Sequence, residues 1–109
     1  MLRTVLKSKI SYGVVTDSNL FYEGSIGVDL DLLEKANIIP GEQVHVVNVN
    51  NGERLITYAI AQDRGSKKFV LNGPAARKGE IGDEIIIISY AINQDKEVLT
   101  PIIIDLKHG

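Results

Sequence analysis

Apolar and polar residues alternate with a period of two along several short stretches of this chain, which is the spacing of β-strands. The stretches that predict strands are residues 2–15, with a bend at Gly13 that leaves one or two strands, and residues 43–49, 53–61, 67–71, 84–90 and 102–106. The stretch 84–90 is aliphatic and β-branched, so we expect it to be buried on both faces. The stretch 102–106 is expected as a last strand on the outside of the molecule.

Two short helical segments interrupt this pattern. The first is predicted at residues 30–36, where Asp29 and Asp31 are both candidate caps and Asp31 with Glu34 has the spacing of a capping box. The second is a single turn at residues 74–77, because proline suits the first helical position, where its missing N–H does no harm. Residues 17–20, 26–28 and 93–96 are predicted as a turn, an apolar link and a loop.

The sequence Asn50-Asn51-Gly52 is the strongest hairpin signal of the chain, because Asn-Gly suits a type I′ turn. On the returning strand, successive side chains point to opposite faces. One face is predicted to carry Arg54, Ile56 and Tyr58, and the other Leu55, Thr57 and Ala59. Short strands, glycine turns and one or two short helices together indicate an all-β fold, a small closed or nearly closed β-barrel.

Composition narrows the possibilities for domains and partners. A chain of 109 residues with 44% hydrophobic residues is expected to form one domain, residues 1–109. Its net charge of −2, with both signs interspersed, gives no footprint for nucleic acid or for an anionic membrane surface. The aliphatic run 85–88 is much too short to span a bilayer, and the N-terminus has no apolar signal core. We therefore expect a cytoplasmic protein with neither nucleic acid nor membrane as a partner.

Metal and disulfide chemistry find little support in the sequence. The chain has no cysteine, which excludes disulfides and thiolate metal sites and fits a reducing compartment. Its two histidines, His45 and His108, lie far apart and lack metal-ligand spacing. No metal is expected.

The sequence Tyr22-Glu23-Gly24-Ser25 forms a tight connection between an apolar segment and the helix-start signal. Gly24 has access to backbone angles closed to other residues, and its carbonyl is unshielded. A hydroxyl beside a strained peptide can attack the preceding carbonyl and turn the amide into an ester. Elimination and hydrolysis of the ester leave Gly24 as a new C-terminus and Ser25 as an N-terminal pyruvoyl group. Gly-Ser alone is too common to support this chemistry, and an ordinary turn is the simpler interpretation.

An ordered set of short motifs favours the self-cleavage chemistry over the ordinary turn. The motifs are Met1-Leu2-Arg3-Thr4, Lys7-Ser8-Lys9-Ile10, Tyr22-Glu23-Gly24-Ser25, Asn51-Gly52-Glu53-Arg54, Thr57-Tyr58-Ala59-Ile60, Arg64-Gly65-Ser66 and Asn72-Gly73. In order and spacing they resemble the self-processing, pyruvoyl-dependent aspartate 1-decarboxylases, from Met1 to about Tyr90. The resemblance implies a double-ψ β-barrel that cleaves itself into residues 1–24 and 25–109. It also implies a homotetramer with its sites at subunit interfaces.

The activity implied by the resemblance is decarboxylation of L-aspartate at its α-carboxylate to β-alanine and CO2, for pantothenate and coenzyme A synthesis. Loss of CO2 leaves a carbanion, and no standard side chain is a carbonyl that can accept its electron pair. A pyruvoyl group made from Ser25 supplies one through a Schiff base with the substrate amine. Pyridoxal phosphate is not implied, because nothing in the sequence resembles its phosphate cradle.

The resemblance also implies roles for individual residues. Arg54 grips one substrate carboxylate, Lys9 holds or neutralises the other, and Tyr58 protonates the carbanion. Thr57 hydrogen-bonds the Gly24 carbonyl and stabilises the oxyanion of self-cleavage. Without the resemblance, Lys9 is a solvated strand edge, Arg54 a surface charge of the hairpin and Tyr58 a core aromatic residue; Lys7 is interpreted as surface in either case.

Residues 72–75 and Tyr22 complete the predicted site. Asn72 positions the pyruvoyl group, Gly73 with the backbone of Pro74 and Ala75 contacts the substrate, and Tyr22 lines the pocket. Pro74 departs from the family, where alanine is frequent, and it has no N–H to donate.

Two questions stay open at this level. Thr57 and Tyr58 are neighbours on one strand, so period two sends them to opposite faces. Either a bulge re-aims one of them, or the pocket lies between subunits and is lined from both sides. The alternative to an enzyme is a small β-barrel binding or regulatory module with no covalent chemistry.

Overall fold

The computed structural model describes residues 1–94 and 99–109 of the chain. Within these residues the elements are β1 (Leu2–Val14), β2 (Asp17–Asn19), β3 (Ser25–Asp29), α1 (Leu30–Lys35), β4 (Gln43–Asn48), β5 (Arg54–Gln62), β6 (Phe69–Asn72), the 3₁₀ helix η1 (Gly73–Lys78), β7 (Glu84–Gln94) and β8 (Ile102–Asp105). The strands are hydrogen-bonded in the order β2-β6-β3-β5-β4-β7-β1-β8. The predicted all-β class with two short helices is confirmed.

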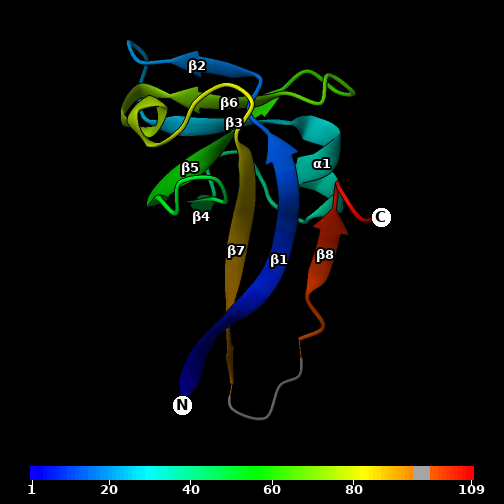
Figure 1. The fold of residues 1–109 in the computed structure, drawn as a ribbon. Helices are drawn as coiled ribbons and strands as arrows, with labels where there is room; N and C mark the ends of the chain where they lie inside the picture. Colours follow the sequence, from blue (N-terminus) through cyan, green and yellow to red (C-terminus); the bar gives the residue numbers. More distant parts are fainter. Residues whose placement is uncertain (95–98) are drawn as a thin grey trace.

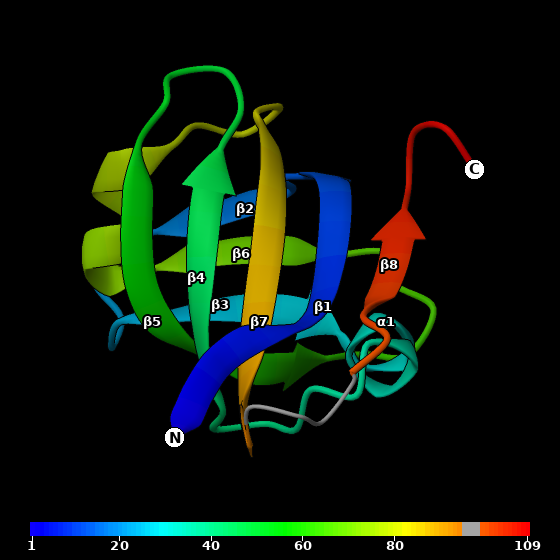
Figure 2. The ribbon, with the colours of Figure 1, turned by 90° about the horizontal axis from the view of Figure 1, so that it is seen from below.

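The sheet curls round until its distant parts meet. After β1, the N–H of Val15 donates to the carbonyl of Asp83, just before β7, and the N–H of Thr16 donates to the carbonyl of Phe69 in β6, both at 2.9 Å. These bonds join the β7–β1 side of the sheet to the β6 side, and Figure 2 shows β2, β6 and β3 crossing over the strands β5, β4, β7 and β1. The result is the nearly closed barrel that the sequence predicts.

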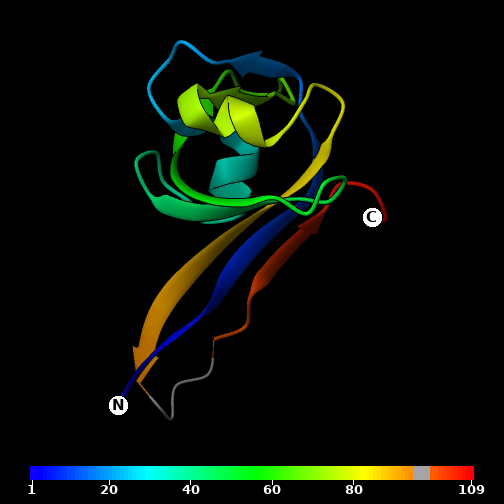
Figure 3. The same cartoon turned by 60° about the vertical axis from the view of Figure 1, so that its left-hand side comes forward.

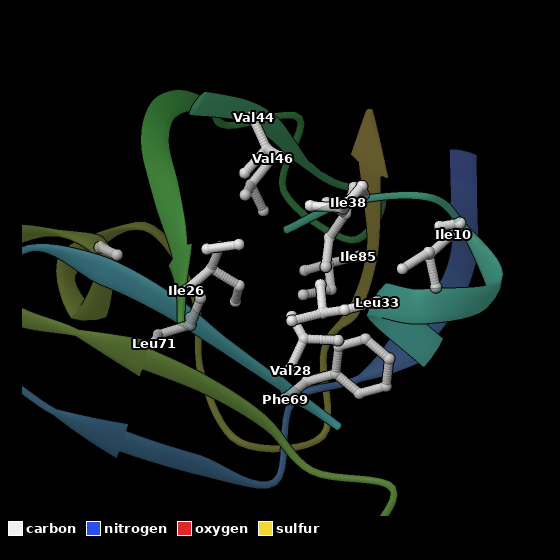
Figure 4. Packing of buried hydrophobic residues seen from close by; sticks show 14 of the residues in the cluster. Ile10, Ile26, Val28, Leu33, Ile38, Val44, Val46, Phe69, Leu71 and Ile85 are labelled. Carbon is white, nitrogen blue, oxygen red and sulfur yellow. The ribbon is translucent and has the colours of Figure 1, made fainter. Parts of the chain in front are cut away.

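The barrel interior is filled by aliphatic side chains from both sides of the curled sheet. Figure 4 shows Ile26 and Val28 of β3 facing Val44 and Val46 of β4, with Leu33 of α1 among them. All five are at most 1% exposed. Burial of such a side chain contributes roughly 1.5–3 kcal/mol to folding. The helix therefore packs against the core as one of its walls.

β1 and β7 continue beyond the barrel as a projecting two-stranded arm (Figures 1 and 3). In the arm, residues 2–6 pair antiparallel with residues 90–94, and the register shifts between Leu6 and Ser8. Leu2 is 63% and Ile92 68% exposed, so the arm offers apolar side chains to solvent. β8 runs parallel to β1 at the edge of the sheet, which confirms the predicted outer strand.

Several local predictions were wrong. Residues 17–20 and 26–28 were predicted as a turn and a link, but they contribute β2 and β3, which are too short to show a period. β7 is not buried on both faces: Ile85 and Ile87 are buried, whereas Ile86 and Ile88 are half-buried, because only one face of β7 meets the barrel interior. Of the predicted loop 93–96, residues 93 and 94 belong to β7, and residues 95 and 96 lie outside the described residues.

The hairpin between β4 and β5 is also built differently from the prediction. Gly52 has a φ of +75°, but the described residues with positive φ do not include Asn51, as a type I′ turn requires. Asn48 holds the loop instead: its carbonyl accepts from the Gly52 N–H at 2.9 Å, and its side chain accepts from the Asn50 N–H at 2.9 Å. The loop is therefore longer than a two-residue turn.

Asp29 caps α1 and anchors the end of the strand that begins with Ser25. Its carboxylate accepts from the N–H groups of Asp31, Gly65 and Lys67, at 2.9, 3.1 and 2.8 Å. Burial alone raises the pKa of this carboxyl, but the three donors and the charge of Arg64 outweigh burial and hold the pKa below its usual value. The candidate Asp29 is thus the cap, and the capping box of Asp31 with Glu34 is not formed, because Arg64 binds both carboxylates.

None of the helices in the described part of the chain is long and apolar enough to cross a membrane.

Candidate active site

Ser25 is the first residue of β3 and is fully buried. It pairs with Asn72 of β6 in the antiparallel ladder, and the side-chain amide of Asn72 donates to the Ser25 hydroxyl oxygen at 3.1 Å. Asn72 is itself only 4% exposed. The pair holds the hydroxyl of Ser25 in a fixed place beside the Gly24–Ser25 peptide bond.

The segment after Asn72 packs directly against the predicted cleavage segment. Gly73 has a φ of +62°, and a Cβ at this position would lie 2.4 Å from the Tyr22 carbonyl oxygen and 2.9 Å from the Gly24 nitrogen. The ring of Pro74 lies on the same side, with its Cδ 3.5 Å from where a Gly24 Cβ would stand. Ala75 follows in η1 and is buried. Asn72, Gly73 and Pro74 are thus brought to the Gly24–Ser25 bond, as the sequence predicts.

Gly73→Ala is expected to destabilise the fold by about 2–4 kcal/mol, because it adds a backbone clash to a left-handed conformation. Gly52→Ala is the matched control: Gly52 also has a positive φ, of +75°, but nothing lies within 4 Å of the added carbon. The control is expected to lose only about 1 kcal/mol. Urea unfolding of both variants measures the difference, and equal losses would contradict the close approach at Gly73.

Gly24 does not use the conformational freedom that glycine gives it. Gly24 is not among the described glycines with positive φ, whereas Gly73 is. The left-handed residue that allows the two segments to approach therefore stands opposite the cleavage bond rather than in it. Gly24 has space for a side chain, since only the Pro74 ring lies within 4 Å.

Thr57 approaches the same bond from β5. β3 and β5 pair in parallel from Ile26 opposite Ala59, and Thr57 lies two residues before Ala59, as Gly24 lies two residues before Ile26. Thr57 is half-buried on the inward face of β5. Among the described residues, no hydrogen bond joins its hydroxyl to the Gly24 carbonyl. We call Ser25, Gly24, Thr57, Asn72 and Gly73 the inner group.

Arg54 and Tyr58 lie on the opposite face of the same strand. β5 pairs with β4 in an unbroken register, from Gln43 opposite Tyr58 to Val47 opposite Arg54. Along β5, exposed Arg54 and Tyr58 alternate with half-buried Thr57. Of the two possibilities left by the sequence, the bulge is wrong, because none interrupts this pairing.

Lys9 shares the outer face with Arg54 and Tyr58. Its neighbours Ser8 and Ile10 are fully buried in the barrel, so the Lys9 side chain points outward from β1. No hydrogen bond or ion pair is formed by its ammonium group within the described residues. We call Lys9, Arg54 and Tyr58 the outer group. Lys7, predicted as surface, is instead held by Glu42 at 2.7 Å and by the Asn37 carbonyl at 2.6 Å, with 17% of its side chain exposed.

Residues of the two groups line different hollows. Tyr22 is 54% exposed and lines a hollow of about 390 Å³ with Asn72, whereas Arg54 lines another, of about 350 Å³, with His45. Asn72, the partner of Ser25, and Arg54 are thus found in different hollows. Within residues 1–94 and 99–109, no three His, Cys, Asp or Glu side chains are grouped so that they could hold a metal ion.

Comparison with protein families gives a match over residues 1–108 to the family described as aspartate decarboxylase. The chain belongs to the aspartate decarboxylase family. Relatives include the aspartate 1-decarboxylases of Francisella tularensis subsp. holarctica (strain OSU18), 56% identical over 100% of this chain and 99% of that protein, and of Coxiella burnetii, 56% identical over 98% and 97%. The aspartate 1-decarboxylase of Thermoanaerobacter pseudethanolicus is 55% identical over 89% of this chain and 83% of that protein.

Among solved structures, a computationally designed protein, msDPBB_sym2, superposes with a TM-score of 0.50 and covers 80% of this chain and 99% of its own. At 15% identity this likeness concerns the fold alone. The design is a double-ψ β-barrel, which confirms the predicted architecture. Membership in the aspartate decarboxylase family also supports the predicted enzyme over the non-catalytic barrel module.

In this aspartate decarboxylase family member, two residues on the outer face, His45 and Tyr90, were not predicted as site residues. His45 was considered only as a metal ligand, and Tyr90 only as the end of a strand. The Tyr90 hydroxyl lies 3.1 Å from Nδ1 of His45, and the ring centroids are 4.8 Å apart. The available signal was the alternation of β4, which puts His45 on the face opposite the buried Val44 and Val46.

Proposed function

We propose that this chain is a self-processing aspartate 1-decarboxylase, which converts L-aspartate to β-alanine and CO2 in the cytoplasm and supplies pantothenate and coenzyme A synthesis. The observation that carries the proposal is the buried Ser25 hydroxyl, held by Asn72 beside the Gly24 carbonyl, in a member of the aspartate decarboxylase family. The relatives named above supply the substrate and the reaction.

Self-processing begins with the Ser25 hydroxyl. Its oxygen attacks the Gly24 carbonyl carbon, the Gly24–Ser25 C–N bond breaks, and the Ser25 nitrogen takes the hydroxyl proton, so that an ester replaces the amide. Loss of the Ser25 α-proton expels the Gly24 carboxylate, and water then replaces the nitrogen, which leaves as ammonia. The products are residues 1–24 and residues 25–109, the second with an N-terminal pyruvoyl group. Thr57, two residues before the Ala59 that pairs with Ile26, is the proposed donor to the oxyanion.

The inner group suits a pyruvoyl group at position 25. The Asn72 side-chain amide binds the Ser25 hydroxyl before cleavage, and once that oxygen has left with the Gly24 carboxylate its N–H is free to donate to the group at position 25; Gly73 leaves the backbone free of a side chain on that side. A pyruvoyl carbonyl supplies the site that reacts with an amino group and accepts the electron pair released with CO2. Gly73, Pro74 and Ala75 are the proposed backbone contacts of the substrate, with Pro74 limited to its carbonyl, and Tyr22 the proposed lining residue.

The outer group suits the ends of aspartate. Arg54 binds one carboxylate with its planar guanidinium, Lys9 neutralises the other, and Tyr58 donates the proton that the carbanion needs. In one chain these residues lie on the face of the sheet opposite Thr57, and Arg54 lines a different hollow from Asn72. We therefore propose that the active site joins the inner group of one subunit to the outer group of another, within a homotetramer.

Denaturing intact mass spectrometry of the purified protein, with a coupled assay for β-alanine, tests this function. Two species are expected, residues 1–24 and residues 25–109, the second with a mass that fits pyruvoyl rather than serine at its N-terminus. A chain that stays whole after prolonged warm incubation, or a cleaved chain that releases no CO2 from aspartate, would overturn the proposal.

A further inference from the structure

His45 lies at the centre of the outer face, between the members of the outer group. In the sheet it stands opposite Ile56 of β5 on one side and Ile88 of β7 on the other, and Ile88 in turn stands opposite Lys9 of β1. The order across the face is therefore Ile56, His45, Ile88, Lys9. His45 is the ionisable residue of this row closest to β5.

Arg54 and Tyr58 flank the same position diagonally. They are two residues before and after Ile56, on the same face of β5. Diagonal neighbours of this kind lie about 7–8 Å apart, within reach of long and aromatic side chains. His45 and Arg54 also line one hollow, of about 350 Å³. A ligand held by Arg54 on this face therefore lies next to the imidazole.

Tyr90 fixes the direction of the imidazole ring. Its hydroxyl is 3.1 Å from Nδ1, with the two rings at 65° to each other. When the hydroxyl donates to Nδ1, the proton of the neutral imidazole is on Nε2. Nε2 is then a hydrogen-bond donor whether the ring is neutral or protonated. The His45–Tyr90 pair thus presents one N–H donor, Nε2, on a ring that can be neutral or positively charged.

The groups around His45 supply positive charge and leave no carboxylate for it. The titratable and charged groups facing it are Lys9 from β1, Arg54 and Tyr58 from β5, Tyr90 from β7 and Glu42 from the turn before β4. Glu42 lines the hollow of about 510 Å³ beside His45 and Tyr90, but one of its oxygens accepts from Lys7 and the other from the Ile39 N–H. No hydrogen bond joins Glu42 to His45 in the described part of the chain, so Nε2 is available to an anionic ligand.

We propose that His45 is a further substrate-binding residue, which donates from Nε2 to a carboxylate of a small dicarboxylic amino acid, and that Tyr90 is the positioning residue that holds its ring. This inference rests on the proposed function and adds a residue to it. Protonation of His45 adds a third positive charge, beside Lys9 and Arg54, to the outer face, so aspartate is expected to bind more tightly to the protonated ring than to the neutral one.

Steady-state kinetics of the cleaved enzyme between pH 5.5 and 8.5 test the role of His45. His45→Gln is expected to raise KM for aspartate about 10-fold at pH 6, change kcat less than about twofold, and abolish the rise of KM with pH. Tyr90→Phe is expected to raise KM about threefold but keep its pH dependence. His108→Gln, at the other histidine, exposed near the C-terminus, is the control and should match the parent. An unchanged KM profile in folded His45→Gln would overturn the proposal.

A second measurement does not depend on turnover. The chain has two histidines, so His108→Gln leaves the NMR signals of the His45 ring alone. Succinate, a dicarboxylate without an amine, is expected to shift the His45 signals and to move their titration to higher pH. If succinate leaves both unchanged in an enzyme that turns over aspartate, His45 is not a substrate contact and the proposed function stands. If the protein neither cleaves itself nor turns over aspartate, the result contradicts the proposed function itself.

Discussion

Ser25→Ala is expected to remain a single uncut chain of 109 residues and to produce no β-alanine. Without the hydroxyl there is no nucleophile beside the Gly24 carbonyl, and without cleavage there is no pyruvoyl group. The substitution also leaves the side-chain amide of Asn72 without its partner in a buried place, at a cost of about 1–3 kcal/mol. Intact mass spectrometry and circular dichroism together measure cleavage and folding.

The chain provides a matched control for this prediction. It has a second Gly-Ser pair, Gly65-Ser66, in the turn before β6. Gly65 has a φ of +74°, the left-handed angle expected of a strained glycine, but Ser66 is only half-buried and its hydroxyl accepts from the Lys68 N–H. Ser66→Ala is expected to cleave as the parent does. Cleavage in Ser25→Ala, or a cut at Gly65, would remove Ser25 from its proposed role.

Two features near the cleavage bond could not be predicted from sequence patterns. A glycine signals access to unusual angles, but not whether the angle is used: Gly24 does not use it, and Gly73 does. The contact that fixes the site joins segments almost fifty residues apart, Ser25 with Asn72. No local period records such a pairing, so Asn72 entered the prediction only through the family resemblance.

Where the sequence of a strand alternates clearly, as in β5, the prediction was accurate. The two faces of β5 were assigned correctly, with Arg54 and Tyr58 on one and Thr57 on the other. β2 and β3 were missed because three to five residues show no period and both pair in parallel with strands distant in sequence. The type I′ turn failed because the side chain of Asn48, outside the Asn-Gly signal, holds the loop.

Tyr58→Phe is expected to cleave normally but to lose at least about 100-fold in kcat, because protonation of the carbanion loses its donor. Tyr58 is 36% exposed and forms no hydrogen bond within the described residues, so the fold should be unaffected. Tyr12→Phe, on the far end of β1, is the control and should keep full turnover. Normal turnover in cleaved Tyr58→Phe would remove the phenol from catalysis.

Co-expression of Ser25→Ala with Tyr58→Phe tests whether the two groups meet between subunits. Thr57 and Tyr58 point to opposite faces of an unbroken strand. Because Ile26 pairs with Ala59, the face of the sheet that carries Ser25 is the face of Tyr58, so the phenol could come from the same chain as Ser25 or from another. If each site takes Ser25 from one chain and Tyr58 from another, random mixing leaves about a quarter of the sites with both native residues. The mixture should therefore recover about a quarter of the parent activity, although each variant alone has almost none. If the mixture is as inactive as its parts, both residues of a site come from the same chain.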